Sequence, residues 1–353
     1  MSDLLQHTAR GLYCPAGGFY IDPLRPVDRA VVTHAHADHA RWGCCHYLAS
    51  EPSRHLLRMR LGPSVDLQCL PFGKTITVGG VHLSMHPAGH MLGSAQIRLE
   101  YRGRVAVVTG DYKLGREDAT CLPWEPLRCH LFVTESTFGL PIYRWPPQQA
   151  IFAAINAWWR DCRQEGTCCL LYGYAVGKSQ RLLSGLDPTI GPIYTHGAVE
   201  KGTGAYRQTG VSLPPTIAVN TLDDRHDYRG SLVVAVPGAH GTPWMRRFGT
   251  VRTAMASGWM TVRGARRRRG VDRGFVLSDH VDWPGLLEAV RLTDPEETWV
   301  THGSAAVVAR HLNEIGCPAQ ALTGLHRAGG EDEDAADASS AEAAAYEASS
   351  PPS

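Results

Sequence analysis

Short apolar runs alternate with amphipathic segments along this chain of 353 residues, a pattern typical of an α/β protein. Apolar runs predict strands at residues 29–32, 104–109, 131–134, 170–174, 231–236, 275–277 and 299–301. Two further runs predict an antiparallel pair, residues 76–85 and 95–101. The amphipathic segments predict helices at residues 147–165, 178–186 and 305–315. We therefore expect an α/β fold with several short strands.

A histidine or an acidic residue lies just past the carboxyl end of five of these strands: His34, Asp111, Glu135, His280 and His302. In open α/β sheets, ligands bind at the carboxyl ends of the strands. All five side chains are metal-ligand or acid–base types, so we expect distant parts of the chain to converge on one pocket. The alternative is that polar residues follow strands without a shared role.

The densest group of such residues is the run Thr-His-Ala-His-Ala-Asp-His, which supplies His34, His36, Asp38 and His39. Neutral imidazole and carboxylate are the usual donors for zinc and related metals. Bringing so many titratable groups together costs free energy unless a cation offsets it. The run therefore indicates a metal site, with histidines on a solvated loop as the alternative.

The composition is ordinary for a globular protein, with 43% hydrophobic and 20% charged residues. No apolar run approaches the roughly 20 residues of a membrane span, and the first ten residues show no signal-peptide core. Ten cysteines occur without a C-x-x-C pair. We interpret them as reduced thiols of a cytoplasmic protein, with a cysteine metal site as the alternative.

The formal net charge of +1 hides an asymmetry, because residues 331–353 contain seven acidic residues and no Lys or Arg. Without those seven negative charges the body of the chain carries +8. Residues 328–353 are predicted to be a disordered acidic tail, since they cannot bury enough apolar surface to offset the ordering entropy. A basic body suits a polyanionic partner.

Seven motifs, in order, resemble those of metallo-β-lactamase-fold hydrolases and, within that superfamily, of the β-CASP nucleases. They centre on Asp22, the histidine run from residue 34 to 39, His90, Asp111, Glu135, His280 and His302. The resemblance implies an αββα sandwich with an inserted β-CASP cap. Its expected parts are residues 1–139 and 273–327 for the metallo-β-lactamase domain, 140–272 for the cap, and 328–353 for the tail.

The resemblance also implies two divalent metal ions, zinc being expected and manganese remaining open. One would be held by His34, His36 and His90, the other by Asp38, His39 and His302, and Asp111 would bridge both. Two such ions can share a hydroxide and clamp a phosphate, and catalytic zinc keeps a position for water. Asp22 is expected to orient a ligand histidine. Its alternative is a strand-end Asp in a turn.

Cleavage of a phosphodiester also needs a proton for the departing oxygen. His280 is the candidate general acid, because imidazole titrates near neutrality. Glu135 would hydrogen-bond it, an arrangement that resembles the pair distinguishing β-CASP nucleases from lactamases. Asp38 joins these two as a candidate catalytic residue. A structural core histidine is the alternative for His280.

Candidate substrate contacts are Lys178 in the turn 172–180, Arg266 and Arg267 in the basic run 263–269, and Ser304. The alternatives are an ordinary strand-to-helix turn and a solvated basic loop. Four aromatic residues are candidates for stacking on bases of a single strand, or else belong to the core: Tyr143, Trp145, Tyr174 and Tyr206.

Within the β-CASP group the chain resembles the bacterial ligase-associated DNA exonucleases, in residues 11–23, 37–42, 138–145 and 192–199. This implies a metal-dependent DNA exonuclease of repair, working beside an ATP-dependent DNA ligase and a helicase, with no membrane association. The alternative enzyme is an RNA-processing nuclease like the cleavage factors of mRNA 3′ ends, which keep a histidine at the position of His302. Two further hypotheses remain: a nucleic-acid scaffold with an inactive metal site, and a small-molecule hydrolase.

Overall fold

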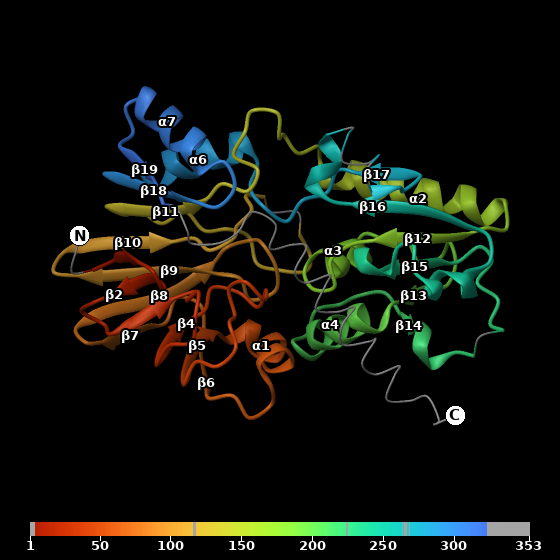
Figure 1. Ribbon diagram of the computed structural model, residues 1–353, viewed down its shortest axis with the longest axis horizontal. Helices are drawn as coiled ribbons and strands as arrows, with labels where there is room; N and C mark the ends of the chain where they lie inside the picture. The colour runs from red at the N-terminus through yellow and green to blue at the C-terminus, as the bar shows by residue number, and fades with distance from the viewer. Residues whose placement is uncertain are drawn as a thin grey trace. The chain divides into compact units, whose positions relative to one another are not determined.

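The computed structural model describes residues 4–115, 118–223, 225–262, 264, 267 and 269–322 (Figure 1). The chain divides into two compact units. Unit 1 is formed by Met1–Arg144 and Asp279–Gly330, and the described residues of unit 2 are those within Trp145–Ser278. Arg266 and the predicted tail lie outside the described residues, and the domain limits from the sequence stay a prediction.

The first sheet of unit 1 has six strands in the order β1-β2-β3-β4-β5-β6. They are β1 (Gln6–Thr8), β2 (Gly11–Cys14), β3 (Phe19–Ile21), β4 (Arg29–Val31), β5 (His46–Ser50) and β6 (Leu67–Leu70). From β3 to β6 the strands run parallel. The helix α1 (Arg54–Leu61) follows β5 through a short 3-10 turn, Glu51–Ser53.

The second sheet of unit 1 has seven strands in the order β19-β18-β11-β10-β9-β8-β7. They are β7 (Thr75–Val78), β8 (Val81–Pro87), β9 (Ala95–Tyr101), β10 (Arg104–Val108), β11 (Leu131–Glu135), β18 (Glu297–Thr301) and β19 (Ala319–Ala321). The strands from β7 to β10 pair antiparallel, whereas β10, β11, β18 and β19 pair parallel. The single strand predicted for residues 76–85 is wrong, because Gly79 and Gly80 at φ 58° and 83° turn the chain between β7 and β8.

Alternating side chains of the seven-stranded sheet face two different cores. Val108 and Val133 pack in a cluster with Ile21 and Val31 of the first sheet, so the two sheets face each other. The neighbouring residue Phe132 points the opposite way, into a cluster with residues of α6 (Trp283–Thr293) and α7 (Ala305–Glu314). Unit 1 is therefore a sandwich of two sheets, with α6 and α7 on the outer face of the second.

Unit 2 contains a single sheet whose six strands all run parallel, in the order β14-β13-β15-β12-β16-β17. They are β12 (Cys168–Tyr172), β13 (Ile193–Thr195), β14 (Ile217–Ala218), β15 (Leu232–Ala235), β16 (Val251–Ala256) and β17 (Arg273–Phe275). Its described residues include the helices α2 (Gln148–Gln164), α3 (Lys178–Ser184) and α4 (Gly197–Gln208) (Figure 1). They also include four short 3-10 turns: Val219–Thr221, Pro237–Ala239, Pro243–Phe248 and Gly258–Thr261.

The α/β fold class is confirmed, and most predicted elements are present within two residues of their expected limits. The strand expected at 170–174 begins two residues earlier, at Cys168, and the strand expected at 275–277 is β17, which ends at Phe275. Twelve of the described elements were not predicted from the sequence: β1, β2, β3, β5, β6, β13, β14, β16, β19, α1, α4 and α6. Among the described residues, no helix has both the length and the apolar character needed to cross a membrane.

Candidate metal centre

The candidate site of unit 1 is built from loops that leave the carboxyl ends of its strands. His34 follows β4, Asp111 follows β10, Glu135 is the last residue of β11, and His302 directly follows β18. Gly110 has a φ of 57°, and a Cβ on it would lie 2.6 Å from the Thr33 side chain. Only glycine therefore lets the loop that carries Asp111 approach the loop that carries His34.

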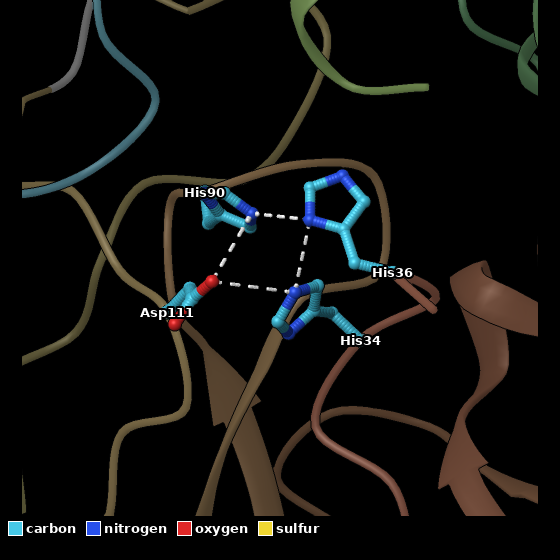
Figure 2. Close-up of side chains that lie close together, drawn as sticks. All are labelled: His34, His36, His90 and Asp111. Carbon is cyan, nitrogen blue, oxygen red and sulfur yellow. Dashed lines mark hydrogen bonds and ion pairs between the residues drawn. The ribbon is translucent and has the colours of Figure 1, made fainter. Parts of the chain in front are cut away.

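Four side chains converge in a compact group: His34, His36, His90 and Asp111 (Figure 2). Their candidate ligand atoms all lie within 4.8 Å of one another. The Nδ1 atom of His36 is 3.1 Å from Nε2 of His34 and 3.2 Å from Nε2 of His90. The Oδ2 atom of Asp111 is 3.6 Å from Nε2 of His34 and 3.9 Å from Nε2 of His90. Four donor atoms thus face a common point.

Hydrogen bonds on the far side of two rings fix which nitrogen faces that point. The Nδ1 atom of His90 is 3.0 Å from the carbonyl oxygen of Asp279, which can only accept, so Nδ1 carries the proton. The Thr33 hydroxyl donates its single proton to Oδ2 of Asp22, at 2.5 Å. It must then accept from Nδ1 of His34, at 3.1 Å. Both neutral rings therefore present the lone pair of Nε2 to the group.

A second set of side chains surrounds the other side of Asp111. Its Oδ2 atom is 3.5 Å from Nε2 of His39, and its Oδ1 atom is 3.9 Å from Nδ1 of His302. The Nε2 atom of His39 is also 3.6 Å from Oδ2 of Asp38. On its far side, the His39 ring is bonded through Nδ1 to Oδ2 of Asp22, at 2.7 Å. Asp22 is itself held by the Thr33 backbone N–H, which donates to Oδ1 at 2.8 Å.

The pKa shifts of the buried histidines differ with their neighbours. Burial lowers the pKa of His34 and of His90 well below 6.5, because the charged ring loses its hydration. Burial acts in the same way on His39, but the carboxylates of Asp111, Asp38 and Asp22 outweigh it and raise its pKa well above 6.5. Burial would raise the pKa of Asp111, yet His39 and His280 hold it well below 3.8. Burial lowers the pKa of His302.

Glu135 and His280 form a buried pair next to this group, with 1% and 3% of their surfaces exposed. The Nδ1 atom of His280 lies 2.8 Å from Oε1 and 3.0 Å from Oε2 of Glu135. The carboxylate also accepts from the backbone N–H groups of Tyr112, at 3.1 Å, and Thr137, at 3.3 Å. Since Nδ1 of His280 is 3.9 Å from Oδ2 of Asp111, the pair adjoins the metal-ligand candidates.

The residues present fit a divalent metal ion. Neutral imidazole nitrogens and a carboxylate oxygen are the donors that zinc and its neighbours take, and here they converge in a buried place. Within the described part of the chain, the buried Oδ1 atom of Asp111 has no hydrogen-bond partner, as a ligand oxygen would require. The unit therefore carries a His/Asp group able to hold divalent metal.

The candidate substrate residues are placed less favourably. The Lys178 side chain is 1% exposed inside unit 2, which counts against direct contact with a phosphate. Arg267 is exposed in unit 2, and Arg266 is not among the described residues. Ser304 is half-buried in unit 1, just before α7, where its N–H donates to the carbonyl oxygen of Ser136.

The aromatic candidates are also mostly internal, since Tyr143, Tyr174 and Tyr206 are 6%, 4% and 0% exposed. Trp145 is half-buried. Sequence reasoning missed two residues of interest in unit 1, Thr33 and Trp42. Thr33 bonds to groups on both sides of the site, and Trp42 is 75% exposed. Their positions at either end of the histidine run were the available signal.

Comparisons with known proteins identify relatives of this chain. No protein-family model matches the chain. A protein of Opitutus terrae called probable DNA ligase is 34% identical over 318 residues, which cover 89% of this chain and 30% of that protein. The endoribonuclease ysh1 of Aspergillus fumigatus is 32% identical over 34% of this chain and 14% of its own length. The cleavage and polyadenylation specificity factor 73 of Drosophila melanogaster is 24% identical over 84% of this chain and 51% of its own length.

A solved structure of a protein of unknown function from Enterococcus faecalis superposes with a TM-score of 0.57 and 12% identity. It covers 83% of this chain and 78% of its own, which shows a shared fold. The resemblance inferred from the seven motifs is confirmed: the chain is similar to metallo-β-lactamase-fold β-CASP nucleases. It spans between about a seventh and a half of the length of these three curated relatives.

Proposed function

We propose that this chain is a metal-dependent phosphodiesterase that cleaves nucleic acid, with the site in unit 1. One observation carries the proposal: a buried His/Asp group able to hold metal adjoins a buried Glu135–His280 pair. The first group suits binding and activation of a phosphate, and the second suits proton transfer. A small-molecule hydrolase needs no such pair, and a scaffold without catalysis needs neither.

We assign two metal ions to the site, zinc before manganese. His34, His36 and His90 would hold one ion, and Asp38, His39 and His302 would hold the other. Asp111 would contact both, and Asp22 would position His39 through its bond to Nδ1. When bound, a pair of divalent ions polarises the phosphate and supplies a strong nucleophile at neutral pH.

The protein side chains then handle geometry and protons. The bond between Glu135 and Nδ1 of His280 fixes the ring and leaves Nε2 as the atom that exchanges a proton with the substrate. As the bond between phosphorus and the leaving oxygen breaks, His280 would give its proton to that oxygen. The two backbone N–H groups on Glu135 keep the carboxylate aligned.

For the substrate we favour DNA and a role in ligase-associated repair, as an exonuclease. The support is the relative called probable DNA ligase, which is similar to almost the whole described chain. The matched region is under a third of that relative, so its name points to an association with ligation rather than to ligase activity here. A separate ATP-dependent ligase and a helicase as partners, and a cytoplasmic location, belong to the same proposal.

RNA processing is the second candidate. Two relatives favour it by name, an endoribonuclease and a cleavage and polyadenylation specificity factor. His302 favours it as well, because RNA-processing members of the family resembled here keep this histidine.

Parallel digestion of end-labelled single-stranded DNA and RNA, with Zn²⁺ or Mn²⁺ added and with chelator as control, tests these proposals. We expect DNA to be shortened stepwise and chelator to stop the reaction. Cleavage of RNA alone would select the second candidate, and release of internal fragments would replace the exonuclease by an endonuclease. A metal-loaded protein that leaves both strands intact would refute the nuclease proposal.

A further inference from the structure

Trp42 is the most exposed large apolar side chain in the described part of the chain, with 75% of its surface exposed. A single exposed apolar residue is ordinary. This indole is held, however, because its Nε1–H donates to the carbonyl oxygen of Leu61, at the end of α1, at 3.2 Å. A fixed ring with open surface loses little conformational entropy when a flat partner binds it.

The ring is connected to the candidate metal centre through the chain and through α1. Trp42 follows His39 by three residues. The Nε atom of Arg60, in α1, donates to the carbonyl oxygen of Ala35, which lies between His34 and His36. The turn before β5 is fixed as well, because the Tyr47 hydroxyl donates to the carbonyl oxygen of Arg41 at 2.7 Å. The indole, α1 and the histidine run thus form one bonded assembly within unit 1.

The chain segment that carries the ring is richer in basic than in acidic residues. Residues 40–62 contain four arginines, at 41, 54, 58 and 60, and a single acidic residue, Glu51. Glu51 is already paired with Arg54, through bonds of 2.9 and 2.7 Å. Arg58 is exposed on α1, the helix whose last residue, Leu61, accepts the hydrogen bond of the indole. A flat apolar ring within excess positive charge matches single-stranded nucleic acid.

We propose that Trp42 is a stacking platform for a base of a single-stranded nucleic acid, next to the site of cleavage. The inference rests on the proposed function and adds a named substrate contact to it. Base stacking on an aromatic side chain is tolerant of sequence. Trp42 would therefore contribute affinity and position rather than choice of base.

The test measures binding of a fluorescent phosphorothioate strand, which is cleaved slowly, to the full metal-loaded chain. A second strand carries abasic sugars in place of the bases. We expect Trp42→Ala to weaken binding of the normal strand roughly 5- to 100-fold and to leave binding of the abasic strand unchanged. Trp42→Phe keeps a ring and should recover most of the affinity. Ile315→Ala, which removes another exposed apolar side chain of unit 1 (55% exposed), is the matched control.

The outcomes separate this inference from the proposed function. Equal loss of affinity for both strands would overturn stacking, as would wild-type affinity in Trp42→Ala. A wild-type protein that cleaves nucleic acid while Trp42→Ala binds normally would refute only the Trp42 inference. A wild-type protein that neither binds nor cleaves either strand would refute the proposed function itself.

Discussion

The two sides of Asp111 differ in packing and in charge. On one side, His34, His36 and His90 lie with Asp111 in a group whose ligand atoms are all within 4.8 Å. On the other, His39 and His302 lie at similar distances from Asp111, 3.5 and 3.9 Å, and the carboxylates of Asp22 and Asp38 contact His39. His34 and His90 thus give the first side two neutral rings, and His39 gives the second side a ring surrounded by carboxylates.

This difference shows how the same ligand types can be prepared for a cation in two ways. On the first side, burial lowers the pKa of His34 and His90, so these rings are neutral and present their Nε2 lone pairs to the group around Asp111. On the second, the carboxylates of Asp111, Asp38 and Asp22 raise the pKa of His39, and the same negative charge would favour a metal cation there. Both arrangements offset the cost of burying polar groups, and both depend on Asp111.

The largest effect is expected from Asp111→Ala, which acts on both sides at once. Loss of the shared carboxylate should lower metal affinity by more than about 100-fold, the upper range for loss of a residue that only orients a ligand. Cleavage should fall below detection. Metal content after dialysis, by mass spectrometry, and digestion of a labelled strand measure the two effects. Full activity in this variant would refute the shared role.

Variants on single sides sharpen the same comparison. His90→Ala should cost one equivalent of metal from the first side, and His302→Ala one from the second. Asp66→Ala is the control, because Asp66 is an exposed carboxylate paired with His46 at the surface, and it should change neither metal content nor cleavage.

The next largest effect is expected from His280→Ala. This variant tests whether His280 is a proton donor or one of the metal ligands. Asp111, Glu135 and His280 also have ligand atoms within 4.8 Å of one another, so His280 is geometrically able to be a ligand. If it is the proton donor, the rate of the chemical step should fall about 10²- to 10⁴-fold while metal content stays at the wild-type value. Single-turnover kinetics and metal analysis of the same preparation measure this.

A large loss of metal in His280→Ala would instead make His280 a ligand and extend the first side to the Glu135 pair. His311→Ala, in α7, removes a histidine packed on Trp283 and serves as the control. It should leave both the rate and the metal content unchanged.

The side of the site that contains His34 was predictable because its residue types stand close together in the sequence or directly after predicted strands. His34 and His36 stand in one run, and His90 and Asp111 each follow a recognisable strand. His280 was predicted as the residue past a short strand, but that strand is β17 in the sheet of unit 2, and His280 lies five residues further on. Its pairing with Glu135 comes from the fold, since 145 residues separate them.

What the sequence could not supply is burial and the direction of side chains. Lys178 follows a glycine at a strand-to-helix turn, as a phosphate-binding residue would, yet it is buried. Apolar periodicity does not mark Gly79 and Gly80 as the turn that splits the strand predicted at 76–85. Trp42 is of a residue type that is usually largely buried, yet it is exposed.

Thr33 offers the finest test of the comparison, because its hydroxyl reaches both sides. It donates to Asp22, which orients His39, and accepts from Nδ1 of His34. Thr33→Val keeps the shape but leaves Nδ1–H of His34 without an acceptor, so the ring loses its preference for presenting Nε2. We expect metal affinity to fall roughly 10-fold to 100-fold, more for the ion on the His34 side, because His39 keeps its bond to Asp22. Competition with a chelator measures the affinity.

Two control variants accompany Thr33→Val. Thr33→Ser should recover the metal affinity. Thr298→Val removes a buried hydroxyl of β18 that has no hydrogen-bond partner among the described residues, and it should change nothing. Equal affinities in Thr33→Val and wild type would show that the rings are held by packing alone and that the hydroxyl does not distinguish the two sides.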